Sequence, residues 1–103
     1  MYRCRAPKNQ TEIDTYYQLR WQVLRSPWQQ PKGSEKDELE SQSYHRVILD
    51  DMDNIVGVGR LHKCNQHSAQ IRYMAIDDAA QGKGLGKLLL EEFERIALQV
   101  GVT

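Results

Sequence analysis

The chain has 103 residues, enough for one small domain with one hydrophobic core. Its 14 basic and 14 acidic side chains balance, so overall charge gives no reason to expect nucleic acid or an anionic membrane as a partner. No apolar run approaches the roughly 20 residues that span a bilayer. The start MYRCRAPKNQ lacks the apolar segment of a signal peptide, and two cysteines make no disulfide framework. We therefore expect a cytoplasmic protein without a nucleic-acid or membrane partner.

The N-terminal part predicts a short strand followed by a helix. Residues 2–5 form the strand pattern, and apolar side chains recur at helical spacing from Ile13 to Leu24. Thr11 is the expected N-cap, with Asp14 three residues later as in a weak capping box. Pro27 follows shortly after and ends the helix.

A polar loop and three strand patterns come next. The loop covers residues 29–42, with room for one helical turn at residues 35–40. The strand patterns occupy residues 43–51, 54–63 and 69–77. Because the turns between them are short, consecutive strands must be antiparallel.

Patterns within these strands predict which side chains share a face. Alternation in the third strand places Ile71, Tyr73 and Ala75 on one face and Arg72, Met74 and Ile76 on the other. Three arginines fall on neighbouring strands and are interpreted as a solvated face: Arg46, Arg60 and Arg72. Gly57 and Gly59 indicate a bulge or a close backbone approach.

The last predicted element is an amphipathic helix with an unfavourable start. Its apolar stripe consists of Leu85, Leu88, Leu89, Phe93, Ile96, Ala97 and Val100, and Gly101 is suited to end it. Glycine in a helix costs roughly 1 kcal/mol relative to alanine, and Lys83 and Lys87 oppose the positive end of the helix dipole. Unpaired amides, close backbone approach at glycines and added positive charge all favour a bound phosphate or pyrophosphate. The alternative is a glycine-rich turn that caps a surface helix.

The spacing of the glycines distinguishes between phosphate motifs. In Gln81-Gly82-Lys83-Gly84-Leu85-Gly86 the glycines are one residue too close for a Walker A loop, and Leu88 stands where Ser or Thr should follow Lys87. A dinucleotide fingerprint needs G-x-G-x-x-G in a parallel unit, whereas this segment follows antiparallel strands. The pattern Q/R-x-x-G-x-G/A fits, between a strand and a leucine-rich helix. It resembles the acetyl-CoA-binding motif of the GNAT family of N-acetyltransferases.

That resemblance implies a fold, a reaction and a set of binding residues. It implies a single GNAT-like domain over residues 1–103 with an α+β, truncated acyl-CoA N-acyltransferase fold: an antiparallel sheet of about four strands in the order β-α-(α)-β-β-β-α. Acetyl-CoA would be the cosubstrate and a small-molecule amine the acceptor. The binding residues implied are Met74, Ala75 and Ile76 for the pantetheine arm, Gly82, Lys83, Gly84, Gly86 and Lys87 for the pyrophosphate, and Gln81 for the shape of the loop.

The chain also departs from the family pattern. Gln70 stands where several members carry a glutamate base, and an amide side chain takes no proton. Asp77 and Asp78 lie near the loop, and Glu38 and Glu40 fall in the region that often contacts acceptors, but none is assigned as base. The resemblance implies that the last third of the fold is missing, so the catalytic residues stay unknown.

A missing third would leave one edge of the third strand pattern unpaired, and exposed edges recruit partners. We therefore expect a homo-oligomer such as a dimer. The alternative to an active N-acetyltransferase is a non-catalytic remnant that binds CoA or dimerises.

Two side-chain groups leave further alternatives open. His62, Cys64 and His67 could bind a metal, or be ordinary hairpin residues without an evident fourth ligand. The aromatic residues Tyr16, Tyr17, Trp21 and Trp28 either pack in the core or line an acceptor site.

Overall fold

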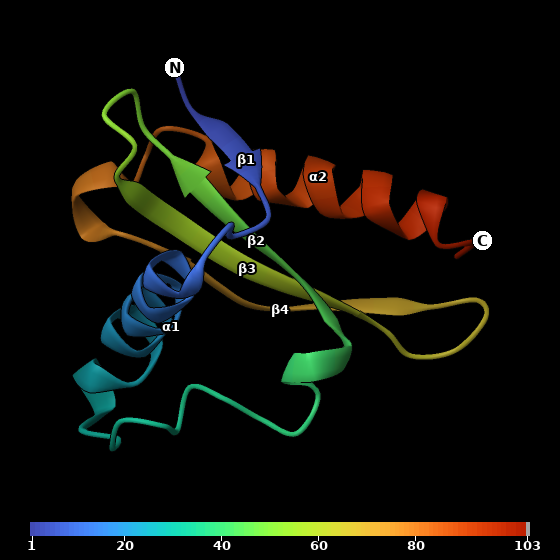
Figure 1. Ribbon diagram of the computed structural model, residues 1–103, viewed down its shortest axis with the longest axis horizontal. Helices are drawn as coiled ribbons and strands as arrows, with labels where there is room; N and C mark the ends of the chain where they lie inside the picture. The colour runs from blue at the N-terminus through green and yellow to red at the C-terminus, as the bar shows by residue number, and fades with distance from the viewer. Residues whose placement is uncertain (103) are drawn as a thin grey trace.

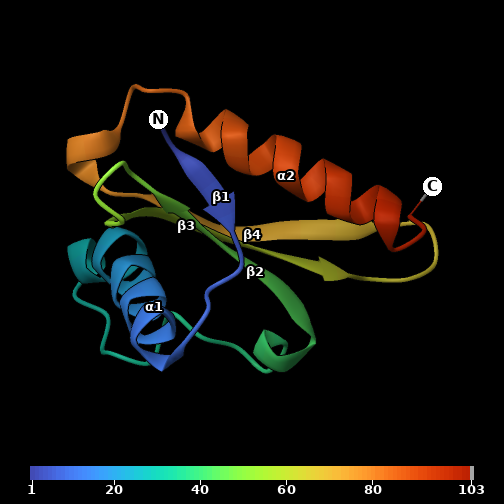
Figure 2. The same ribbon diagram turned by 45° about the horizontal axis from the view of Figure 1, so that its top comes forward.

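The computed structural model describes residues 1–102 and forms one antiparallel sheet between two helices. The elements are β1 (Arg3–Arg5), α1 (Gln10–Leu24), η1 (Ser26–Trp28), η2 (Glu40–Gln42), β2 (Ser43–Leu49), β3 (Ile55–Lys63), β4 (Ala69–Ile76), η3 (Asp78–Ala80) and α2 (Leu85–Gln99). The strands lie in the order β1-β2-β3-β4, so β4 is an edge strand in the described part of the chain. Figures 1 and 2 show α1 on one face and α2 on the other. The predicted α+β class and element order are confirmed.

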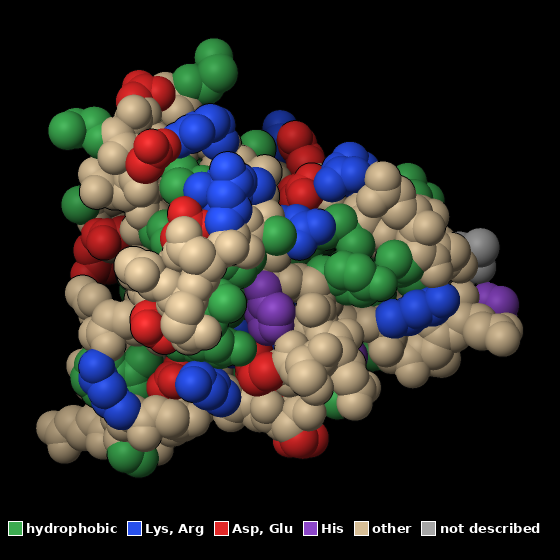
Figure 3. Space-filling model, viewed as in Figure 1, with side chains coloured by type: hydrophobic (Ala, Val, Ile, Leu, Met, Phe, Trp, Pro, Cys, Tyr) green, Lys and Arg blue, Asp and Glu red, His purple; other side chains and the backbone are tan. Residues whose placement is uncertain are grey.

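Each helix covers its own apolar cluster on the sheet. On the α2 side, the predicted stripe is confirmed: Leu85, Leu89, Phe93 and Ile96 are buried, and Leu88, Ala97 and Val100 pack against them. On the α1 side, Tyr16 and Leu19 pack on Val47, Leu49, Val58 and Ala75. No helix between residues 1 and 102 is long and apolar enough to cross a membrane. Acidic and basic side chains are interspersed over the face shown in Figure 3.

The structure corrects the predicted start of α1. The N-cap is Asn9, whose side chain accepts a hydrogen bond from the amide of Glu12 at 2.9 Å. Glu12 is held in turn by the guanidinium of Arg5 and accepts from the amide of Lys8. Asparagine is a better N-cap than threonine, and Glu12 occupies the favourable third helical position, so the helix begins earlier than Thr11.

The helical turn predicted at residues 35–40 is also wrong. Its carboxylates bind loop amides instead: Asp37 Oδ1 accepts from Leu39 N at 2.9 Å, and Glu40 Oε2 accepts from Asp37 N at 3.0 Å. Such local side-chain bonds compete with helix formation. A single 3-10 turn forms later, at Glu40–Gln42.

A bulge in β4 overturns the predicted alternation. Pairing passes from Val58↔Ala75 to Arg60↔Arg72, so β4 contains one extra residue there, and Tyr73 has φ +57°. One extra residue moves every later side chain to the opposite face. Ile71 therefore packs on the α2 side together with Met74 and Ile76, while Ala75 faces α1.

The two strand glycines allow a close approach, as predicted. A Cβ added at Gly59 would lie 2.8 Å from Cε2 of Phe93, whose side chain is fully buried. We expect Gly59→Ala to lower the free energy of unfolding by about 1–3 kcal/mol, because overpacking forces neighbours out of place. Urea denaturation measures this, with Gly86→Ala as control, since its added Cβ would be 3.9 Å from the nearest atom. Equal stability of wild type and Gly59→Ala would contradict the close packing.

Candidate functional site: the glycine loop and the β4 edge

The segment between β4 and α2 is tied to the end of the strand by side chains. Asp77 Oδ1 accepts from Ala79 N at 3.0 Å and so caps η3. The side-chain amide of Gln81 donates to Ile76 O at 3.3 Å and to Asp78 Oδ1 at 3.2 Å. Both aspartates thus take part in shaping the turn, and Gln81 joins the loop to β4.

The start of α2 carries amides without acceptors. The N-cap is Gly84, with φ +76° and no capping side chain, and Gly82 has φ +81°. Among the described residues, no acceptor takes a hydrogen bond from the amides of residues 82–87. Lys83 and Lys87 are exposed, and Lys87 Nζ is 4.0 Å from Glu91 Oε1. This arrangement offers hydrogen-bond donors and positive charge to an anion.

A cavity of about 360 Å³ lies beside these amides. The predicted site residues that line it are Met74, Ile76, Gln81, Gly82, Gly84 and Gly86. Ala75 does not, because its side chain is buried on the α1 face. The Asp77 amide donates to Val56 O at 2.9 Å, so by antiparallel alternation the backbone groups of Ile76 point to the outer edge.

A buried ion network lies under α1 and was missed by sequence reasoning. Arg60 is fully buried rather than solvated: its guanidinium contacts Asp37 at 2.6 and 3.0 Å and Glu40 at 2.9 Å. Arg20, also fully buried, contacts the same Glu40 oxygen at 2.9 Å. One signal for this was Arg20 standing four residues after Tyr16, on the apolar side of α1.

The other two arginines of the predicted solvated face, Arg46 and Arg72, differ in exposure. Arg46 is half-buried and contacts Glu92 at 2.9 Å, whereas Arg72 is exposed as expected.

The candidate base positions lie in different surroundings. Gln70 is exposed on β4, and Glu38 is exposed on the loop. Glu40 belongs to the ion network and also accepts from the Tyr17 hydroxyl at 3.2 Å.

Tyr73 links this network to the β4 bulge. Its ring lies 4.6 Å from the guanidinium carbon of Arg20 and 4.7 Å from that of Arg60. Its hydroxyl donates to Asp37 Oδ2 at 3.2 Å. These contacts stabilise the left-handed backbone at Tyr73, next to Met74 in the cavity wall.

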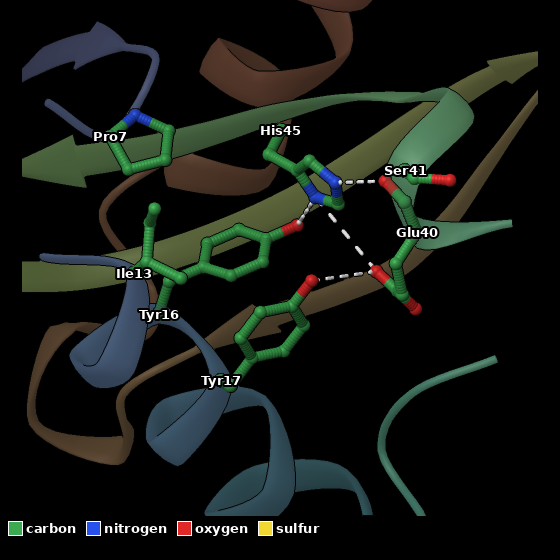
Figure 4. A pocket seen from close by; sticks show the side chains of 7 residues that line it. All are labelled: Pro7, Ile13, Tyr16, Tyr17, Glu40, Ser41 and His45. Atoms are coloured by element: carbon green, nitrogen blue, oxygen red, sulfur yellow. Dashed lines mark hydrogen bonds and ion pairs between the residues drawn. The ribbon is translucent and has the colours of Figure 1, made fainter. Parts of the chain in front are cut away.

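A second cavity, of about 380 Å³, opens on the α1 side (Figure 4). Its walls include the rings of Tyr16, Tyr17 and His45, which come from α1 and β2. Of the aromatic group, Tyr16 therefore serves both the core and a cavity wall. Trp28 is 75% exposed, and Trp21 donates to Gln30 O at 3.0 Å.

His45 in this second cavity is expected to resist protonation. Its Nε2 lies 2.7 Å from Glu40 O, which only accepts, and its Nδ1 lies 2.7 Å from the Tyr16 hydroxyl. Burial lowers the pKa of His45 below its usual 6.5. Stability from this residue is therefore present above pH 6.5 and decreases as pH falls below that value. Urea denaturation from pH 7.5 to 5 should show this slope, and His45→Gln should reduce it; an unchanged slope would contradict the assignment.

The possible metal site at His62, Cys64 and His67 shows a side-chain contact between two of its members. Cys64 Sγ is 3.6 Å from His62 Nε2, and both cysteines are free thiols. Within residues 1–102, no cluster of three or more His, Cys, Asp or Glu side chains could hold a metal ion.

Comparison with known proteins supports the same fold. The Acetyltransferase (GNAT) family profile matches residues 13–103. A structure from Lactobacillus plantarum superimposes with a TM-score of 0.83 at 22% identity, over 99% of this chain and 70% of that one. A Bacillus subtilis acetyltransferase in complex with CoA superimposes with a TM-score of 0.76 at 22% identity, over 99% of this chain and 61% of that one. A GNAT family acetyltransferase from Elizabethkingia anophelis with acetyl-CoA bound superimposes with a TM-score of 0.74 at 14% identity, over 98% of this chain and 60% of that one.

The chain thus spans about three fifths of the length of the last two proteins. At these identities the superpositions establish a shared fold, while the profile covers most of the chain. From the order of its elements, its glycine loop and this match, the chain belongs to the Acetyltransferase (GNAT) family.

Proposed function

We propose that this chain binds acetyl-CoA as cosubstrate and transfers its acetyl group to a small-molecule amine. The observation that carries the proposal is the uncapped start of α2, where the amides of residues 82–87 have no acceptor among the described residues. Two structures with the same fold contain acetyl-CoA or CoA. Both cysteines are free thiols, which fits a cytoplasmic setting.

Each part of the cosubstrate has a counterpart in the chain. The amides of Gly82, Lys83, Gly84, Gly86 and Lys87 bind the pyrophosphate, and the two lysine side chains add positive charge. Backbone groups of Met74 and Ile76, which flank the inward-pointing Ala75, bind the pantetheine arm at the outer edge of β4. Gln81 keeps the loop joined to β4 through its bond to Ile76 O.

The reaction is attack of a neutral amine on the thioester carbonyl. It requires donors for the developing oxyanion and an acceptor for the proton of the amine. Gln70 is an amide and takes no proton. We therefore assign no catalytic base within the chain.

Calorimetry and thiol release test the proposal together. We expect saturable binding of CoA by calorimetry, and release of free thiol from acetyl-CoA with at least one member of a panel of amines. Absence of CoA binding would overturn the proposal. CoA binding without thiol release for any amine would favour the non-catalytic remnant.

The unpaired edge of β4 also supports a homo-oligomer. In the described part of the chain, β4 has a neighbour on one side only, and exposed edges pair readily with other strands. We propose a homodimer. Gel filtration with light scattering should give twice the chain mass, and a monomer at micromolar concentration would contradict it.

A further inference from the structure

A shallow hollow of about 370 Å³ adjoins the glycine-loop cavity along β4. Met74 lines both, so the two spaces meet at this residue. The polar side chains around the hollow are Arg25, Gln70, Arg72 and Tyr73. Under the proposed function, the pantetheine arm follows β4 past Met74, so the hollow lies where an acceptor can reach the thioester.

The charges around Tyr73 do not balance. Four guanidinium groups surround its ring: those of Arg20, Arg25, Arg60 and Arg72. Those of Arg20 and Arg60 are paired with the carboxylates of Glu40 and Asp37. Arg25 and Arg72, at 6.0 and 5.4 Å from the ring, form no ion pair with any of residues 1–102.

These two arginines are held in place without being neutralised. Arg25 Nε donates to Ser34 O at 3.1 Å, and its terminal nitrogens bind no acceptor among the described residues. The carboxylate of Glu35 in the same loop accepts from the Gly33 amide at 2.8 Å and pairs with neither arginine. In a chain of zero net charge, the hollow thus gathers two unpaired guanidinium groups.

Guanidinium groups bind carboxylate and phosphate through paired hydrogen bonds. Gln70, in the same hollow, offers hydrogen bonds without a competing negative charge. We propose that the acceptor is an amine that also carries a carboxylate or phosphate group, and that Arg25 and Arg72 bind this anionic group. This inference rests on the proposed function for the position of the acetyl group.

In the proposed acetyl transfer, one bond forms, one bond breaks and one proton moves. The amine nitrogen forms a bond to the acetyl carbon while the carbon–sulfur bond of the thioester breaks. The proton lost by the nitrogen ends on the leaving sulfur, by way of water. The products are the N-acetylated anionic acceptor and free CoA thiol. The two arginines act by orienting the acceptor, with its amine toward Met74.

Titration of ¹⁵N-labelled full chain with three amines tests the inference. The probes are 4-aminobutyrate, O-phosphoethanolamine and n-butylamine, which differ in the anionic group. We expect one or both anionic amines to shift the amides of β4 and to bind about ten-fold tighter than n-butylamine. The double variant Arg25→Gln/Arg72→Gln should abolish that preference, while Arg3→Gln, an exposed arginine on β1, should keep it.

Failure of the anionic-acceptor proposal can be distinguished from failure of the proposed function. Equal binding of all three amines, or absence of shifts on β4, overturns the anionic acceptor. A preference that survives in the double variant overturns the role of the two arginines. The relative affinities of the two anionic probes identify carboxylate or phosphate as the group recognised. Calorimetry with CoA on the same samples tests the proposed function alone, because the double variant leaves the start of α2 intact.

Discussion

Gly84→Asp should lower the affinity for CoA by about 100-fold or more, because two unit charges about 4 Å apart at a protein surface repel by roughly 4 kcal/mol. The substitution places a carboxylate at the N-cap of α2, among the amides proposed to hold the pyrophosphate. An added Cβ there meets no atom within 4 Å, so the change causes no clash. The left-handed backbone at φ +76° costs a residue with a side chain about 1–2 kcal/mol in folding free energy, which is less than the expected loss of binding free energy. Calorimetry measures the affinity, and urea denaturation measures the stability.

Two further variants separate charge from backbone strain. Gly84→Asn has nearly the same size and no charge, so it should reduce CoA affinity much less than Gly84→Asp. Gly101→Asp carries the same carboxylate at another left-handed glycine, with φ +86° and open space around it, beyond the other end of α2. It should leave CoA affinity unchanged. If Gly84→Asp binds CoA as the wild type does, the pyrophosphate is not held at this helix start.

Features set by local pattern were accessible from the sequence. The apolar stripe of α2 follows from helical periodicity, and its covering of the sheet confirms it. The three long strands follow from alternation and short turns. Gly59 indicated a bulge or a close approach, and the structure shows that Phe93 makes it. The uncapped helix start could be inferred because Gly84, Lys83 and Lys87 act against helix stability.

Features set by tertiary contacts were not accessible. The bulge at Tyr73 depends on the guanidinium groups of Arg20 and Arg60, which come from α1 and β3. An arginine in a strand pattern predicts a solvent-exposed side chain, as it did for Arg60. Only the folded loop brings the carboxylate of Asp37 into contact with Arg60. The hollow with Arg25 and Arg72 was missed for the same reason, since it joins the end of α1 to β4.

Arg60→Met is expected to lower the free energy of unfolding by about 3–5 kcal/mol, because removal of one partner leaves a carboxylate that lacks its counter-charge. Methionine fills much of the same volume, so the loss reflects charge rather than a cavity. Asp37 loses both of its contacts with the guanidinium, while Glu40 keeps Arg20. Urea denaturation at pH 7 measures the effect. Arg46→Met on the neighbouring strand is the matched control: Glu92 keeps Arg95 as a partner, so the loss should be about 1 kcal/mol.

Acidification gives a second readout of the same network. The hydrogen bonds from Arg60 hold the pKa of Asp37 well below its usual range. A carboxylate with a lowered pKa stabilises the fold above its unfolded value of about 4, and this stabilisation disappears as pH falls and the group is protonated. The gap in stability between wild type and Arg60→Met should therefore narrow below pH 4, and Asp37→Asn in the Arg60→Met background should restore part of the loss at pH 7. A gap that stays constant with pH, with no restoration, would mean that Arg60 stabilises the fold by packing alone and not through its charge.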